Sequence, residues 1–256
     1  MGYVIEHERK NTLDPNYVEF VIMNKSNHSY AINRKITEKF NSNSWLNDKC
    51  FVIGGGESLI GFDFNRLNGY HTIGTNKTFQ FYPKLTINYA MDGDFYDGMK
   101  DGRYDVSGQP KIWNAWLTHG CIRVFLTPME LRQFGNEVYV VKRIFKPCVS
   151  RDLVEGIYGG RNSALGALML AVALGSNPIY LLGYDMKVKN QSHWHNGYPN
   201  RDLKDFADKL RGYNEEIASF FLTFEKLGVK IYNLNSDSAL RCFPFTDLEV
   251  ALKDDA

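Results

Sequence analysis

A polar loop carries two histidines, His193 and His195, in the stretch KVKNQSHWHNGYPN. Histidine is the side chain whose ordinary pKa best suits proton transfer near neutral pH. The two rings could also bind a transition metal, although no third ligand of a suitable kind lies nearby in the sequence. Loop histidines also occur without any role, so the place of this loop in the fold matters. It follows a strand expected at residues 179–182, whose exit adds the carboxylate of Asp185, and we predict all three side chains to be catalytic, with His195 foremost.

Two carboxylates flank a glycine at Asp92 and Asp94, directly after an apolar run over residues 85–91. Carboxylate oxygens are ligands for Mg²⁺ or Mn²⁺, and a cation held at a strand exit could bridge a diphosphate. The arrangement matches the DxD element of metal-dependent glycosyltransferases. Asp-Gly-Asp is also common turn chemistry, because aspartate side chains bond to their own backbone. We predict Asp92 and Asp94 as metal ligands and keep a plain turn as the alternative.

A short apolar run at residues 49–53 leads into a glycine-rich turn. Glycines let backbone N–H groups approach a ligand closely, and the helix expected after the turn would favour an anion at its N-terminus. The motif is neither a GxGxxG fingerprint nor a P-loop, so a plain strand–turn–helix connection is the alternative. A second run, 71–76, ends in Asn76, which could contact a ribose or base, or only cap the next turn. The nucleotide-binding residues predicted from these two exits are Gly54, Gly55, Gly56, Glu57, Ser58 and Asn76.

The stretch 159–185 predicts the centre of the fold. Asn162 or Ser163 can cap a helix over residues 164–174 that is apolar on every side and therefore buried. A glycine and a proline end this helix. The strand at 179–182 is apolar throughout, which is typical of a parallel strand buried on both faces. Ligands bind beyond the carboxyl ends of such strands, so we predict that a phosphate meets the helix N-terminus. The nucleotide-binding residues expected here are Arg161, Asn162, Ser163, Gly183 and Tyr184.

Apolar runs alternate with helical patterns along the chain. This alternation predicts an α/β, Rossmann-like fold with a mostly parallel sheet and helices on both faces. Further strands are expected at 138–141 and 229–234, one amphipathic helix at 202–227, and a short helix at the end of the chain. Residues 142–158 are interpreted as a loop with local positive charge.

The domain organisation is expected to be simple. Residues 48–256 form a single Rossmann-like catalytic domain, because no internal repeat or low-complexity linker divides them. Residues 1–47 are polar and rich in Asn and Lys, and we expect an N-terminal extension packed on that domain. One strand or short helix is expected within it at 17–23.

Composition narrows the range of partners. The net charge of +1 argues against direct binding of duplex nucleic acid. Four cysteines without CxxC spacing are typical of reduced thiols in a cytosolic protein. No apolar stretch approaches the roughly 18 residues of a membrane span, and the charged N-terminus carries no signal-peptide core. We expect a cytoplasmic protein, in the host cytoplasm if a phage encodes it. The oligomeric state, including a homo-oligomer, stays open.

The order of motifs resembles a phage and bacterial family among the hydroxymethylpterin diphosphokinase-like proteins. The motifs are FVIGGGESL with GTN downstream, GGRNSALGALMLAVALGSNPIYLLGYDM, HWHNGYP and GVKIYNLNSDSALRCFP, within about residues 48–245. The same order is similar to bacterial sialyltransferases of the Campylobacter type. That likeness implies nucleotide contacts at Gly54–Ser58 and Asn76, donor contacts at Asn162 and Ser163, and His195 as the best match to a loop histidine base.

The two sets of relatives imply different reactions on one scaffold. Sialyltransferases move a sugar from a CMP donor without a metal, whereas the pterin enzymes move diphosphate from ATP and need Mg²⁺. We predict a glycosyltransferase that moves a sugar from a small-molecule donor linked to CMP or UDP to a hydroxyl acceptor, with Mg²⁺ or Mn²⁺ at Asp92 and Asp94. The alternatives are a Mg²⁺-dependent diphosphokinase that uses ATP and a non-catalytic nucleotide-binding phage module.

Overall fold

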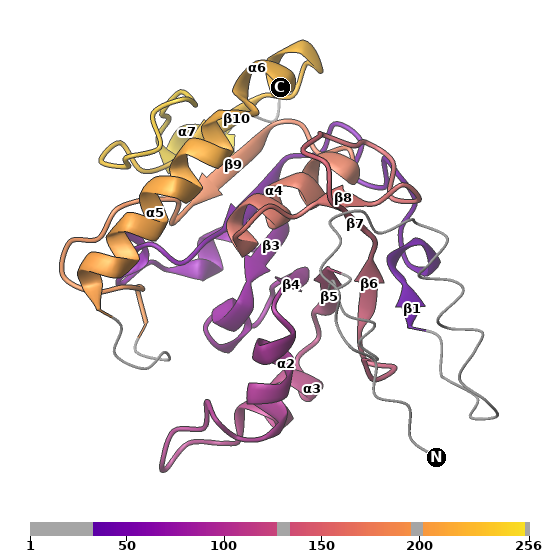
Figure 1. Ribbon diagram of the computed structural model, residues 1–256, viewed down its shortest axis with the longest axis vertical. Coiled ribbons are helices and arrows are strands. Elements are labelled where there is room, and N and C mark those ends of the chain that lie inside the picture. The colour runs from indigo at the N-terminus through magenta and orange to yellow at the C-terminus, as the bar shows by residue number, and fades with distance from the viewer. Residues whose placement is uncertain (1–32, 127–133, 196–201, 254–256) are drawn as a thin grey trace, which may run out of the picture. The chain divides into compact units, whose positions relative to one another are not determined.

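The protein is built on one eight-stranded parallel sheet, as seen in a computed structural model that describes residues 33–126, 134–195 and 202–253 (Figure 1). The strand order is β1-β6-β5-β4-β3-β2-β9-β10, and every pair of neighbours runs parallel. The predicted α/β, Rossmann-like class is therefore confirmed. The strands are β1 (Arg34–Lys35), β2 (Cys50–Ile53), β3 (His71–Thr75), β4 (Ile87–Ala90), β5 (Ile122–Leu126), β6 (Tyr139–Val141), β9 (Ile179–Leu182) and β10 (Ile231–Asn233).

Helices cover both faces of this sheet, because the central strands are apolar on both. In β2, Cys50 and Val52 belong to one core, while Phe51 and Ile53 belong to the other. The first core includes the apolar helix α4 (Ser163–Ala173), which packs across β2, β3 and β4. The second core includes α2 (Gly93–Lys100) and α3 (Ile112–Thr118), with the fully buried Trp116.

The chain reverses its direction of travel across the sheet beside β2. From β2 it steps outward through β3, β4 and β5 to β6, and then returns to place β9 on the other side of β2. The last residues of these two strands, Ile53 and Leu182, are register partners. The loops that leave β2 and β9 therefore diverge from one point, which is where parallel α/β sheets form their ligand crevice.

The central stretch folds as its sequence predicts. Asn162 is the N-cap of α4, and its side-chain Oδ1 accepts the backbone N–H of Leu165 at 2.9 Å. Gly175 follows the helix with φ of 91°, a left-handed value that glycine adopts freely at a helix C-terminus. All four residues of β9 are buried.

The connections after β2 and β3 are short 3₁₀ helices, contrary to the helix expected after the first glycine turn. They are η2 (Glu57–Leu59), η3 (Phe64–Leu67) and η4 (Asn76–Gln80). Gly61 and Gly69 take positive φ values of 73° and 94°, which breaks the segment between β2 and β3 into tight turns. Within the described segment between β2 and β3, no α-helix is therefore present whose N-terminus could meet an anion.

Two other regions differ from the sequence-based prediction. The stretch 142–158, expected to be a loop, contains a separate parallel pair, β7 (Arg143–Ile144) and β8 (Ile157–Tyr158). The helix expected over 202–227 is two helices, α5 (Leu203–Ala218) and α6 (Phe221–Lys226). The Ser219 hydroxyl donates to the Glu216 carbonyl at 2.7 Å, and the Phe220 N–H turns to Ile217, so the α-helical ladder stops there.

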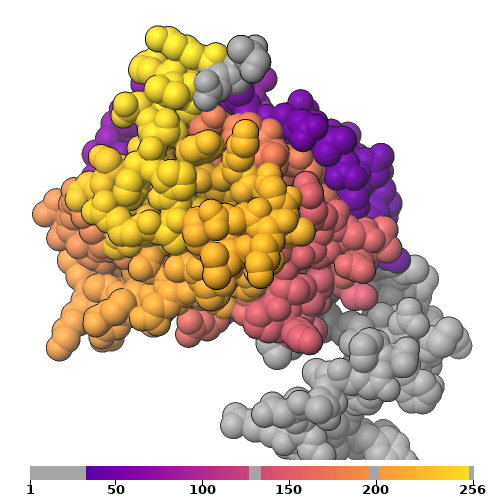
Figure 2. Space-filling model, turned by 90° about the horizontal axis from the view of Figure 1, so that it is seen from above, coloured from indigo at the N-terminus to yellow at the C-terminus, as the bar shows by residue number. Residues whose placement is uncertain are grey.

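The remaining elements lie near the two ends of the described chain. A 3₁₀ turn, η1 (Ile36–Glu38), follows β1, and α7 (Leu248–Lys253) is the expected terminal helix. Seen from above, residues of α5, α6 and the C-terminal segment form one continuous surface (Figure 2). The element expected at 17–23 lies outside the described residues. Among the helices that the structure describes, none has the length and apolarity needed to cross a bilayer.

Candidate active site

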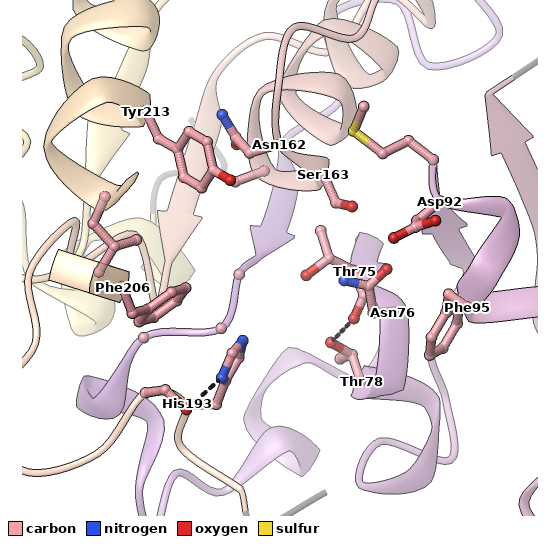
Figure 3. A pocket seen from close by; sticks show the side chains of 18 of the residues that line it. Thr75, Asn76, Thr78, Asp92, Phe95, Asn162, Ser163, His193, Phe206 and Tyr213 are labelled. Atoms are coloured by element: carbon pink, nitrogen blue, oxygen red, sulfur yellow. Dashed lines mark hydrogen bonds between the residues drawn. The ribbon is translucent and has the colours of Figure 1, made fainter. Parts of the chain in front are cut away.

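A cavity of about 690 Å³ opens at the carboxyl ends of β2, β3, β4 and β9. Figure 3 shows Asn162 and Ser163 reaching it from the start of α4, Asn76 and Thr78 from another wall, and His193 from a third. The predicted site residues that line it are Gly54, Gly55, Gly56, Asn76, Asp92, Asp94, Arg161, Asn162, Ser163, Gly183, Asp185, His193 and His195. Three predicted nucleotide contacts, Glu57, Ser58 and Tyr184, are not part of the lining.

The two strand-exit turns pack directly against each other, and this contact explains the glycines. A Cβ on Gly54 would lie 2.7 Å from the carbonyl oxygen of Gly183. A Cβ on Gly56 would overlap the Asp185 carboxylate, and one on Gly55 would lie 3.0 Å from the ring of His193. Side chains at these positions would push the two turns apart, so backbone forms this part of the cavity floor.

Asp185 lies in the turn after β9, and its carboxylate binds the turn after β2. Its buried carboxylate accepts the Ser58 backbone N–H at 2.8 Å, the Ser58 hydroxyl at 2.5 Å and the Asn235 amide at 2.8 Å. Ser58 is thereby directed to Asp185 instead of a ligand. The next residue back, Tyr184, is also structural, because its buried hydroxyl donates to the Ala164 carbonyl at 2.7 Å and ties β9 to α4.

Glu57 makes the reciprocal connection to the histidine loop. Its carboxylate accepts the backbone N–H of Lys189 at 2.7 Å and that of Asn190 at 3.0 Å. Burial by itself would raise the pKa of Glu57, but N–H donors from Lys189, Asn190 and Gln191 outweigh it and the net pKa is lowered. Glu57 therefore stays ionised and fixes the start of the loop that carries His193 and His195.

The two histidine rings occupy different surroundings, 5.9 Å apart between centroids. His193 stacks on Phe206 of α5, with ring centroids 5.3 Å apart, and its Nδ1 lies 3.0 Å from the Ser192 hydroxyl. His195 stacks on Phe81 at 5.2 Å. Burial, and then the positive charge of Lys77, lower the pKa of His195 to about 4, so this ring is neutral at pH 7.

Lys77 is a functional candidate that the sequence did not reveal. It is almost fully buried, with an exposed fraction of 1%, and its ammonium lies 4.2 Å from the centre of the Tyr104 ring. Burial lowers the pKa of Lys77 to about 8. Its neighbours Asn76, Thr78 and Tyr104 all line the cavity, so the Lys77 ammonium lies directly behind the cavity wall that they form.

The start of α4 forms the end of the cavity best suited to an anion. The Asn162 Nδ2 atom is buried and has no hydrogen-bond partner within the described residues. Arg161 contacts the Gly212 carbonyl at 3.1 Å and the Glu216 carboxylate at 3.5 Å. Arg143, from the stretch expected to be a charged loop, also lines the cavity and donates to the Gly160 carbonyl at 2.9 Å. Two guanidinium groups thus accompany the N-terminus of an 11-residue helix.

Asp92 and Asp94 lie at the cavity edge, but they also form the start of helix α2. Asp92 is the N-cap of α2, and its Oδ1 accepts the Asp94 backbone N–H at 2.9 Å. In the ranges that the structure describes, no group of three His, Cys, Asp or Glu side chains could hold a metal. The two carboxylates fit a cation only if a bound phosphate and water supply its other ligands, as is common for Mg²⁺.

Comparison with known proteins supports the fold class. No protein-family model matches this chain, and no curated protein is significantly similar to it. The structure is similar to that of the MAf glycosyltransferase from Magnetospirillum magneticum AMB-1, with a TM-score of 0.50 and 12% sequence identity. The match covers 78% of this chain and 34% of the glycosyltransferase, so this chain corresponds to about a third of that protein. At this identity the likeness establishes a shared fold.

Proposed function

We propose that this protein is a glycosyltransferase that uses a nucleotide-activated sugar, linked to CMP or UDP, as its donor. One observation carries the proposal. Two buried polar atoms on different walls of the cavity, the acceptor Asn76 Oδ1 and the donor Asn162 Nδ2, lack partners among the described residues. Buried polar groups are normally satisfied, so a polar ligand that spans the two walls is expected. The glycine turns between them leave backbone for that ligand to approach.

The proposed orientation follows the charges. The nucleoside would lie over Gly54–Gly56 and against Asn76, and its phosphate would meet Asn162 and Ser163 at the start of α4. Arg143 and Arg161 stand on the same side. The negative charge that builds up on the departing phosphate would then face the helix dipole and two guanidinium groups.

His195 is the proposed general base. Its neutral ring would take the proton of the acceptor hydroxyl while the hydroxyl oxygen bonds to the anomeric carbon and the nucleotide leaves with the electrons of the glycosidic bond. His193 is the second candidate. For Asp185 we propose a positioning role, because its oxygens hold Ser58 and Asn235. A divalent cation, if used, would be held by Asp92 and Asp94 and would supply charge neutralisation at the phosphates.

A diphosphokinase is the second candidate, favoured by one finding. Among the described residues, three cationic side chains line the cavity, Arg143, Arg161 and Lys187, and the diphosphokinase reaction needs such a clamp around a triphosphate. Each of them already has a protein contact, including Lys187 with Asp237 at 2.6 Å. The shared fold with a glycosyltransferase supports sugar transfer more directly.

A thermal-shift screen with CMP, UDP, GDP and ATP, each with and without Mg²⁺ or Mn²⁺, tests the proposal. A ligand at about 100 times its Kd stabilises a protein by roughly 2.7 kcal/mol, which such a screen detects. Stabilisation by CMP or UDP is expected. Stabilisation by ATP and Mg²⁺ alone would favour the diphosphokinase, and stabilisation by none of these nucleotides would favour a non-catalytic module.

A further inference from the structure

A buried hydrogen-bond relay runs from the second core of the sheet to the cavity wall. Asn88, in the middle of β4, is completely buried. Its Oδ1 accepts the indole N–H of Trp116 at 2.7 Å, and its Nδ2 donates to the backbone carbonyl of Asn76 at 2.7 Å. The same amide group also reaches the Gly74 carbonyl, at 3.3 Å. Residues of α3, β4 and the β3 exit are thus joined by polar contacts.

The orientation of the Asn88 amide is fixed by chemistry. An indole N–H can only donate, so the atom that faces Trp116 must be the amide oxygen. The NH₂ group then necessarily faces the two backbone carbonyls, which can only accept. Trp116 and Asn76 therefore demand the same orientation, and the relay has one arrangement.

The relay ends at a residue with an uncommon backbone conformation. Asn76 has φ of 49°, in the left-handed region that costs a non-glycine residue of order 1 kcal/mol or more. The hydrogen bond from Asn88 to its carbonyl helps to hold that conformation. In it, the Asn76 side chain lines the cavity with a buried Oδ1 for which the described residues provide no donor.

We propose that Asn88 is a positioning residue for nucleotide binding, which it supports by holding Asn76 so that Oδ1 accepts from an O–H or N–H group of the nucleoside. This inference rests on the proposed function, since it names how one wall of the same site is kept in shape. Asn88 itself is not part of the cavity lining. Trp116 contributes by fixing the amide orientation of Asn88.

Asn88→Leu tests the relay with little change in side-chain size. The apolar side chain can neither accept from the Trp116 indole N–H nor donate to the Asn76 carbonyl, so both bonds of the relay are lost. We expect the Kd of the nucleotide found in the screen to rise about tenfold, the value of one good hydrogen bond. Asn76→Ala should weaken binding equally. Because both changes remove one contact, the double variant should bind no more weakly than Asn76→Ala alone.

Thr72→Val is the matched control. Thr72 is buried between the same two strands at their opposite ends, where its hydroxyl contacts that of Thr86 at 3.2 Å. The substitution should lower the melting temperature without changing the Kd. Should Asn88→Leu fold poorly, Trp116→Phe removes only the indole donor and is expected to weaken binding in the same direction. Additive losses in the double variant, or an unchanged Kd, would overturn the positioning role.

A second measurement does not depend on any ligand. Backbone chemical shifts of Asn76 report its φ, and they should leave the left-handed range in Asn88→Leu. Unchanged shifts would overturn the inference whether or not nucleotide binds. If the wild-type protein binds no nucleotide while the shifts change as expected, the proposed function fails and the relay itself stands.

Discussion

The Asp185 carboxylate accepts the backbone N–H of Ser58 at 2.8 Å, and so the loop after β9 holds the turn after β2. The connection is returned one residue earlier, where Glu57 accepts the backbone N–H of Lys189 at 2.7 Å. Each loop thus supplies the carboxylate that the other needs. Because backbone donors cannot be repositioned by a rotamer change, the two contacts fix the glycine floor and the histidine loop relative to each other.

Replacement of Asp185 should therefore destabilise the protein. Asp185→Ala leaves the Ser58 N–H and the Asn235 amide without their acceptor, and we expect a loss of about 3 kcal/mol from charge-assisted bonds of this kind. Urea unfolding measures the loss. Asp63→Ala, which removes only the exposed cap of η3, is the control and should lose about 1 kcal/mol. Equal losses in the two variants would show that the hydrogen bonds of Asp185 stabilise the protein no more than an exposed helix cap does.

Protonation of Glu57 should determine how the histidine loop responds to pH. Since the folded-state pKa of Glu57 is depressed, its stabilisation is present above the ordinary glutamate pKa and is lost as pH falls through the lower folded value. Hydrogen-exchange protection of the Lys189 and Asn190 amides, corrected for intrinsic rates, should be constant near neutral pH and fall in acid. In Glu57→Gln the protection should be weaker at neutral pH. Protection that is identical in the two proteins would contradict this role.

His195 and Lys77 should each change the stability of the protein over a different pH range. The pKa of His195 in the folded protein is about 4, whereas the unfolded chain binds a proton at this residue below about pH 6.5. The free energy of unfolding should therefore decrease as the pH is lowered from 6.5 to about 4. Lys77, with a pKa of about 8, should add stability as pH rises from 8 to 10.5. NMR titration of the His195 ring measures its pKa directly. Lys77→Met should raise that pKa without restoring it to 6.5, because burial is the larger cause.

Asn162→Asp separates two functions of one residue. Asp caps a helix as well as Asn does, so α4 should keep its stability. The orphaned Nδ2 donor, however, becomes a carboxylate oxygen at the end of the cavity proposed for phosphate. We expect calorimetry to show at least a tenfold weaker nucleotide Kd, about 1.4 kcal/mol, with an unchanged melting temperature. Unimpaired binding would place the phosphate elsewhere.

The metal proposal can be tested by chelation. If Asp92 and Asp94 hold a cation together with the donor phosphates, EDTA should abolish turnover, and Mn²⁺ or Mg²⁺ should restore it. The matched variant Asp94→Asn keeps the backbone N–H that Asp92 caps and removes one carboxylate, so it should raise the metal concentration needed for half-maximal rate. Full activity in EDTA would mean that Asp92 and Asp94 bind no catalytic metal and serve only the turn at the start of α2.

The sequence predicted the centre of the fold because local and global preferences agree there. Asn162 at the start of α4, Gly175 after its end and the apolar β9 are each specified within a few residues. Once the strands run parallel, their exits must meet at one edge of the sheet. For that reason thirteen of the sixteen predicted site residues line one cavity although the chain separates them by up to 141 positions.

The rest could not be predicted from local pattern. β5 contains Arg123, which interrupts its apolar run, yet the guanidinium is used to bind the carbonyls of Leu117 and His119 at the end of α3. Glu57 looked like a ligand contact beside three glycines, whereas its partners are backbone groups more than 130 positions away. No sequence pattern marks Lys77 as a site residue, because what distinguishes it is its burial behind Tyr104 in the folded protein. Such roles depend on tertiary contacts.

The central claim is that this cavity transfers a sugar from a nucleotide with His195 as base. The most direct measurement is the rate of free nucleotide release from the CMP- or UDP-sugar that stabilises the protein, with water or an added hydroxyl acceptor, for the wild type and His195→Ala. We expect measurable release that falls by roughly 10²–10⁴-fold in the variant, while donor binding persists. A His195→Ala protein that releases nucleotide at the wild-type rate would contradict it.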